Sequence, residues 1–198
     1  MNKKEMNGKD LLLAFLYSPG IGSVFNEPII GRTKLTKMMF LFEKQLYSRF
    51  FEDSLQIVLP SFEPYFFGPF SRQLFEDLSF FEAIGMVETE ETNIPLSAAD
   101  KVESNDVFDE SSEWSDASFD EDEESFELSY SLSKSGLKYV SEKVWPVFTP
   151  TQIDKLTAFK AQINKISLDS LLRYVYQQYP EEAKNSIIAK RYLNEEND

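Results

Sequence analysis

Apolar residues recur at helical spacing in several stretches of the chain, and this pattern predicts its elements. Residues 7–17 carry a nearly continuous apolar run that predicts a short first helix, closed by Ser18, Pro19 and Gly20. Gly20 and Gly22 then indicate a flexible turn. A second helix is expected from Thr33, because leucine, methionine and phenylalanine follow at spacings of four and three residues on one helical face, at Leu35, Met39, Phe42 and Leu46.

The middle of the chain predicts a helix followed by a β-hairpin. Ser71 is expected to cap a third helix through about residue 83, and Gly85 lies where a left-handed residue ends a helix. Residues 86–89 alternate like a strand, and residues 127–132 are the expected antiparallel partner. Helices followed by two antiparallel strands are the outline of a winged helix. The predicted fold class is therefore α+β, mainly α-helical, with a winged-helix-like core and a small antiparallel β-hairpin.

Additional helices are expected toward the C-terminus. Ser133 or Ser135 caps one over residues 136–144, which Pro146 ends, and Thr149 with Pro150 begins a longer one that reaches about residue 163. A further helix is expected over residues 168–176, and a short last one from residue 180 to residue 188.

Charge divides the chain into two unlike parts. Between Glu88 and Glu127 there are 16 acidic residues and one basic residue, so this segment carries a net charge of −15. The whole chain carries −14, which leaves the other residues with a net charge of about +1. Self-repulsion and sparse aliphatic side chains predict that residues 93–124 form a disordered insertion. Residues 1–92 and 125–190 would form one nearly neutral folded domain, and residues 191–198 a frayed tail.

Composition removes several kinds of chemistry. The chain has no histidine and no cysteine, which excludes serine–histidine and cysteine–histidine catalysis, Cys/His zinc sites and disulfides. We expect no enzyme activity, no metal and no cofactor, since no paired nucleophile and base and no phosphate-binding loop can be named. The apolar run near the start is too short to span a membrane, and the lack of cysteine fits a cytoplasmic protein.

The first candidate contact surface is the basic flank of the second helix. Lys34 and Lys37 lie beside its apolar stripe, where they are available to a partner protein or to the phosphates of a nucleic acid. The alternative is an ordinary solvated helix face.

The second candidate surface is an aromatic stretch around a Gly-Pro pair. Tyr65, Phe67 and Phe70 surround Gly68 and Pro69, and such rings mark either a protein interface or a core packed around a tight turn.

The acidic insertion is the third candidate. Trp114 and Phe119 lie among carboxylates, a pattern typical of segments that dock onto a basic, apolar partner. An inert solubilising loop and mimicry of DNA by the carboxylates are the alternatives.

Two of these stretches resemble a known family. Residues 31–40, Gly-Arg-Thr-Lys-Leu-Thr-Lys-Met-Met-Phe, are similar to the lysine- and leucine-containing helix of the Panacea-domain family, which includes SocA-type antitoxins. Residues 65–71 with Leu78 and Gly85 resemble that family's Gly-Pro turn, its following helix and its glycine ending, and residues 171–181 resemble its phage- and defence-associated members. Thr36 stands where the family has glutamine. The resemblance implies a binding module that neutralises a toxin or hands it to a protease.

The expected function is accordingly non-enzymatic binding of a partner protein, a toxin or a defence effector. The contact residues would be Lys34, Lys37, Tyr65, Phe67 and Phe70, with Trp114 and Phe119 of the insertion. A winged-helix transcription regulator that binds DNA and a DNA-mimic inhibitor are the alternative functions. Nothing in the sequence determines the oligomeric state.

Overall fold

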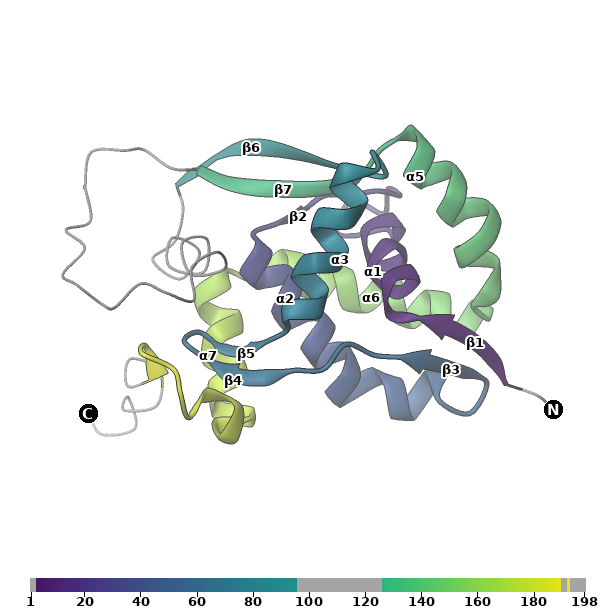
Figure 1. Cartoon of the computed structure of the whole chain (residues 1–198). Coiled ribbons are helices and arrows are strands. Elements are labelled where there is room, and N and C mark those ends of the chain that lie inside the picture. The colour runs from purple at the N-terminus through teal and green to yellow at the C-terminus, as the bar shows by residue number, and fades with distance from the viewer. Residues whose placement is uncertain (1–2, 96–125, 190–191, 193–198) are drawn as a thin grey trace.

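The computed structural model describes residues 3–95, 126–189 and 192, which form an α+β fold that is mainly helical (Figure 1). The helical elements are α1 (Gly8–Tyr17), α2 (Arg32–Leu41), the π-helical η1 (Phe42–Phe51), α3 (Arg72–Ala83), α5 (Lys134–Tyr139), the π-helical η2 (Val140–Val144), the 3₁₀ turn η3 (Trp145–Val147), α6 (Pro150–Lys165), α7 (Leu168–Gln178) and the 3₁₀ turn η4 (Pro180–Ala183). The predicted class, α+β and mainly helical with small antiparallel pairing, is confirmed at this level.

The strands form three separate small sheets. β1 (Lys4–Asn7) pairs in parallel with β3 (Leu55–Val58), and β4 (Glu63–Tyr65) pairs antiparallel with β5 (Gly68–Phe70). The third sheet is antiparallel with the order β2-β7-β6, formed by β2 (Ile29–Ile30), β7 (Phe126–Leu132) and β6 (Val87–Pro95). The predicted pairing across the insertion is confirmed, since Val87 lies opposite Leu132.

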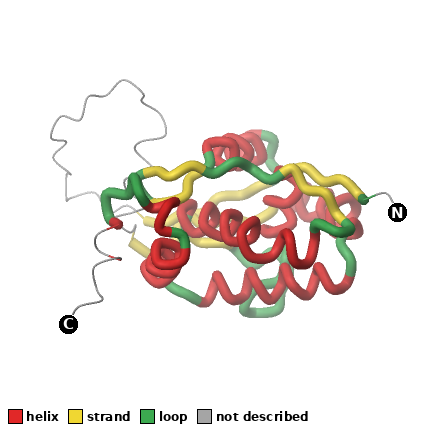
Figure 2. Tube along the Cα trace, turned by 90° about the horizontal axis from the view of Figure 1, so that it is seen from below, coloured by secondary structure: helices red, strands yellow, loops and turns green. Residues whose placement is uncertain are grey.

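Helix α1 lies at the centre of the core. Leu11, Leu12, Leu13, Ala14, Phe15 and Leu16 are all fully buried, so the helix is apolar on every side and is packed on every side. The tube view shows helices lying side by side through the body of the molecule, with strands beside them (Figure 2). The ring of Phe15 meets Phe42 edge-on at 5.3 Å and Phe159 at 6.0 Å, which joins α1 to η1 and α6.

Short-range signals place the helix ends where the sequence predicts them. Asn7 caps α1, since its Oδ1 accepts the backbone N–H of Asp10, and Ser71 caps α3 in the same way through Leu74. Thr149 and Gln152 form a reciprocal capping box at the start of α6. Gly85 follows α3 with a φ of 68°, the left-handed conformation predicted for it.

Several boundaries differ from the prediction. Residues 93–95 belong to strand β6, because Pro95 is paired with Phe126, so the predicted insertion begins too early; its remainder, 96–124, lies outside the described residues. The helix predicted over residues 180–188 is instead a single 3₁₀ turn, η4, that ends at Ala183. Within the predicted frayed tail, Tyr192 is 4% exposed because it packs on Tyr176 at 5.3 Å.

Candidate functional site

The aromatic stretch around Gly68 is mostly interior, which corrects part of the predicted contact surface. Phe67 and Phe70 are 2% and 5% exposed, so neither ring is available to a partner, whereas Tyr65 is half-buried and stacks on Phe70 at 4.9 Å. Gly68 adopts a φ of 82°, and a Cβ there would lie 2.6 Å from the ring of Tyr176. The stretch is therefore a tight turn closed over the core, the simpler of the two interpretations.

The two predicted basic contacts also point inward. Lys37 is fully buried and its Nζ donates to the carbonyl of Pro69 at 3.0 Å, so its assignment as a surface contact is wrong. Lys34 is half-buried and donates to the carbonyl of Ile166, at the C-terminal end of α6, at 2.8 Å. Both lysines thus donate to backbone carbonyls of other elements. Trp114 and Phe119 lie outside the described residues.

A different segment does present apolar side chains to solvent. In the loop that joins α1 to β2, Ile21 is 56% exposed, Val24 65% and Phe25 47%. Phe25 also rests on two other rings, Tyr17 at 4.8 Å and Trp145 at 5.9 Å, so its outer face continues an aromatic platform. We call residues 18–28 the apolar loop.

Glu27 holds the apolar loop in shape. Its carboxylate accepts the backbone N–H groups of Ile21 at 3.0 Å and Gly22 at 2.8 Å, and the side-chain amide of Asn164 at 2.8 Å. Partial burial alone would raise the pKa of Glu27, but the hydrogen bonds from Asn164, Gly22 and Ile21, helped by the charge of Lys160, lower it overall. The carboxylate is packed so closely on Gly20 that a Cβ there would lie 2.0 Å from its oxygen, so the turn expected to be flexible is held by side-chain contacts.

Asn26 fastens the other end of this loop. It adopts a φ of 62°, and its side chain both accepts the N–H of Leu132 at 2.7 Å and donates to the carbonyl of Leu132 at 2.9 Å. The amide thus replaces a strand partner at the end of β7. With Glu27 and Asn26 fixed, the exposed apolar side chains project from a pre-ordered loop.

Lys160 lies beneath the apolar loop. Its Nζ donates to the carbonyls of Leu16 at 2.9 Å and Ser18 at 2.7 Å, where α1 ends and the loop begins. Burial lowers the pKa of this amine to about 7, against a smaller opposing effect of the charge of Glu27. A lysine with such a pKa is a candidate nucleophile or base in a cleft, but this side chain is 0% exposed and both carbonyls occupy it. The arrangement braces the loop.

Two further kinds of feature, a metal-binding cluster and a membrane-spanning helix, can be checked in the described residues. Among residues 3–95, 126–189 and 192, no group of three or more Asp, Glu, His or Cys side chains is placed to hold a metal ion. In the same part of the chain, no helix combines the length and apolar character needed to cross a bilayer.

Helix α3 has an exposed face unlike that of a DNA-reading helix. That face carries Arg72 and Glu76, and it ends in the apolar side chains of Phe80, 47% exposed, and Ile84, 51% exposed. Lys9 from α1 covers part of it, with Nζ 4.6 Å from the centre of the Phe80 ring and 3.2 Å from the carboxylate of Asp77. The two cations here, Arg72 and Lys9, are matched by the carboxylates of Glu76 and Asp77, so this face lacks the excess of positive charge that a phosphate backbone requires.

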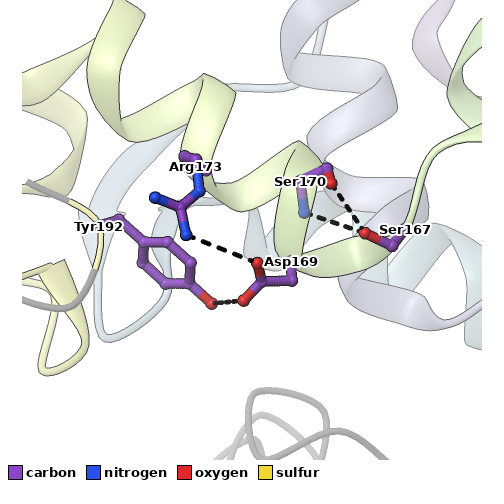
Figure 3. A network of polar contacts seen from close by, with 5 residues as sticks. All are labelled: Ser167, Asp169, Ser170, Arg173 and Tyr192. Atoms are coloured by element: carbon purple, nitrogen blue, oxygen red, sulfur yellow. Dashed lines mark hydrogen bonds and ion pairs between the residues drawn. The ribbon is translucent and has the colours of Figure 1, made fainter. Parts of the chain in front are cut away.

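A polar network at the start of α7 holds the side chain of Tyr192 (Figure 3). The hydroxyl of Tyr192 donates to Asp169 at 2.9 Å, the other oxygen of Asp169 lies 3.9 Å from the guanidinium of Arg173, and that guanidinium lies over the Tyr192 ring at 5.7 Å. Ser167, the N-cap of α7, accepts the N–H of Ser170. These contacts account for the burial of Tyr192 and make the network a structural anchor.

Sequence reasoning missed the apolar loop, although a signal for it exists. Ile21, Val24 and Phe25 interrupt a glycine-containing turn without any helical or strand period, so no element of their own can bury them. Comparisons with protein-family models, with curated proteins and with solved structures found no match to this chain.

Proposed function

We propose that this protein is a non-enzymatic protein-binding module that neutralises or delivers a partner protein, as an antitoxin, a proteolytic adaptor or a regulator of a defence system. The observation that carries the proposal is the apolar loop, a pre-ordered segment that exposes Ile21, Val24 and Phe25 beside two further rings. Aromatic and aliphatic side chains held rigidly at a surface are the usual anchors of protein interfaces.

Electrostatics supports a protein partner of basic character. The described part of the β6–β7 hairpin includes Glu88, Glu90, Glu91 and Glu127 and no Lys or Arg. This charge would repel a nucleic acid and would accelerate association with a basic protein. The resemblance to the Panacea-domain family agrees with such a role, and the cysteine-free composition agrees with a cytoplasmic location.

The order of the elements supports a winged-helix-like core. α1, β2, α2 and α3 are followed by the β6–β7 hairpin, and β2 completes the sheet beside β7. η1, β3, β4 and β5 are inserted between α2 and α3. In this interpretation the hairpin is the wing, and the acidic segment extends from its tip.

The proposal is tested by capture followed by reconstitution. Full-length protein would be used to isolate partners from its native host, and each candidate found by mass spectrometry would be purified and mixed with it to measure stoichiometry and affinity. We expect a stable complex that Val24→Ser weakens by about tenfold, since a buried apolar anchor is worth 1–2 kcal/mol or more.

Val58→Ser is the matched control, because Val58 is 66% exposed and Val24 65%, on different elements. An equal effect of both substitutions would show that the apolar loop is not the contact. Failure to reconstitute any stoichiometric complex would contradict the proposed function itself.

A DNA-binding regulator is the second candidate, favoured only by the order of helices and hairpin. It predicts duplex binding at low salt with a steep loss of affinity as salt increases. We expect no such binding, because the exposed face of α3 has no excess of cations over carboxylates and the described residues of the hairpin include no Lys or Arg. A DNA mimic acting through the acidic segment alone would instead be competed away from its target by duplex DNA, and Val24→Ser would leave its affinity unchanged.

A further inference from the structure

Strand β6 forms the outer edge of the three-stranded sheet. Within residues 3–95, 126–189 and 192, the sheet order β2-β7-β6 leaves one side of β6 without a neighbouring strand, and Figure 1 shows this strand along the outside of the molecule. An edge strand with free backbone groups is a site where an extended segment of another chain can add itself to the sheet.

The hydrogen bonds of β7 determine which backbone groups of β6 face outward. Leu128 accepts from Gly31 and Leu132 bonds to the side chain of Asn26, so the even-numbered residues of β7 direct their backbone groups toward β2. The odd-numbered residues, Ser129 and Ser131, therefore bond to β6, and they lie opposite Glu90 and Glu88.

It follows that Thr89 and Glu91 turn their N–H and C=O groups away from the sheet. Thr89 lies opposite Tyr130 and Glu91 opposite Leu128, the positions where an antiparallel pair makes no backbone bond within the pair. Outside the helices and the strand ladders, no backbone–backbone hydrogen bond within the described residues involves Thr89 or Glu91. Thr89 uses its side chain on Glu82 of α3, which leaves its main chain available.

The side chains beside this edge are acidic. Glu88, Glu90 and Glu91 are all exposed, and the described hairpin carries no cation. A second copy of the same edge would place glutamate beside glutamate, which is destabilising, so the charges guard the edge against self-association. A strand that carries Lys or Arg at alternate positions would instead place its cations beside these carboxylates.

We propose that the outer edge of β6 binds an extended, lysine- or arginine-rich segment of a partner protein as a fourth strand of the sheet. This inference rests on the proposed function and names the chemistry of its partner. Main-chain bonds to Thr89 and Glu91 supply affinity, and Glu88, Glu90 and Glu91 select for positive charge.

The probe is a short capped peptide in which lysine alternates with threonine, added to the full-length protein. Amide hydrogen exchange should slow at Thr89 and Glu91 on binding, and remain unchanged at Glu88 and Glu90, whose N–H groups already bond to β7. The same peptide with N-methyl groups at alternate residues keeps its charge and loses its donors. We expect it to bind at least tenfold more weakly.

A pair of variants separates backbone from charge on the protein side. Glu91→Pro removes both the carboxylate and the outward N–H without breaking a bond to β7, as an edge strand tolerates. Glu91→Ala removes only the carboxylate. We expect Glu91→Pro to weaken peptide binding about fivefold more than Glu91→Ala. The difference reflects the loss of one main-chain hydrogen bond and the bulk of the proline ring at the edge.

Three results would overturn the inference. They are equal affinities of the two Glu91 variants, equal affinities of the two peptides, and slow exchange of the Thr89 and Glu91 amides in the free protein, which would mean that the chain itself occupies the edge. If Glu91→Pro fails to fold, the affinities of the N-methylated and unmethylated peptides for the unaltered protein still test whether main-chain hydrogen bonds are needed. If a partner is reconstituted and its affinity is insensitive to these changes, the binding function stands and only this edge is excluded.

Discussion

Replacing Lys160 with methionine tests a pH dependence of folding that the structure attributes to one amine. Lys160 is 0% exposed, and burial lowers its pKa to about 7 from the ordinary value of 10.5. Either protonation state donates to the carbonyls of Leu16 and Ser18, since a neutral amine retains two N–H groups. Because burial disfavours the charged amine while the neutral amine keeps its hydrogen bonds, folding favours loss of the proton from Lys160.

The sign of the effect follows from the bound protons. Between the two pKa values the unfolded chain holds a proton that the folded chain has released, so the free energy of unfolding increases with pH. The limiting slope is about 1.4 kcal/mol per pH unit. Integrated from about pH 7 to about pH 9, the gain is about 2 kcal/mol. Below the folded pKa both states are protonated, and the burial penalty is present in full.

Urea unfolding of the natural protein and of Lys160→Met across this range measures the gain. We expect the free energy of unfolding of the natural protein to increase relative to that of the variant by about 2 kcal/mol. The comparison is clean because the chain has no histidine or cysteine, while the pKa of Glu27 is lowered and that of Tyr139 is raised, by burial and its bond with Asp10, away from the window. If the free energies of unfolding of the two proteins change with pH in parallel within about 0.5 kcal/mol, the pH dependence does not come from Lys160.

Three further substitutions have expected outcomes by thermal or urea unfolding. Lys37→Ala should destabilise the fold by roughly 2–4 kcal/mol, because it removes a fully buried side chain and leaves a buried carbonyl without its donor. Gly68→Ala should cost about 2 kcal/mol more than Gly85→Ala, since both positions have positive φ but only the first meets a neighbouring ring. Asn26→Gly keeps the left-handed backbone and loses both bonds to Leu132, so the amide of Leu132 should exchange faster and stability should decrease by about 1–3 kcal/mol.

Each of these has a discriminating result. Lys44→Ala is the control for Lys37, because Lys44 lies on the exposed side of η1 and should change stability by less than about 0.5 kcal/mol. Equal losses for the two lysines would mean that burial does not matter. If Gly68→Ala and Gly85→Ala lower the free energy of unfolding equally, the contact with the Tyr176 ring does not contribute to the cost at Gly68. An unchanged exchange rate at Leu132 would show that Asn26 does not hold the loop.

Local signals made much of the fold predictable. Caps at Asn7, Ser71 and Thr149 and the left-handed Gly85 depend on residues a few positions away, and all occur where the sequence indicates. The β6–β7 pairing was also predictable, because Gly85 and Ser133 bracket it and the apolar alternation agrees on both strands.

The candidate site was less predictable because distant contacts decide it. The sequence pattern around a lysine on a helix flank is the same whether its amine contacts water or a backbone carbonyl. The acceptor of Lys160 is the carbonyl of Leu16, more than 140 residues away in the chain. The aromatic stretch shows the same ambiguity, since Phe67 and Phe70 are buried in a turn that Tyr176, more than 100 residues later in the chain, approaches at Gly68. Exposure of the apolar loop likewise depends on Glu27 and Asn26, whose roles require the folded backbone.

The parallel pairing of β1 with β3 has a consequence for the order of events during synthesis. Lys4 is paired with Leu55, so the earliest strand of the chain has no partner until translation has passed Val58. The apolar α1 that follows β1 stays uncovered for longer, because Phe15 packs on Phe159 of α6, and until that helix has been made α1 is exposed to premature association. Chaperone dependence in the cell should accordingly be high for nascent chains truncated before α6 and should decline once that helix has emerged.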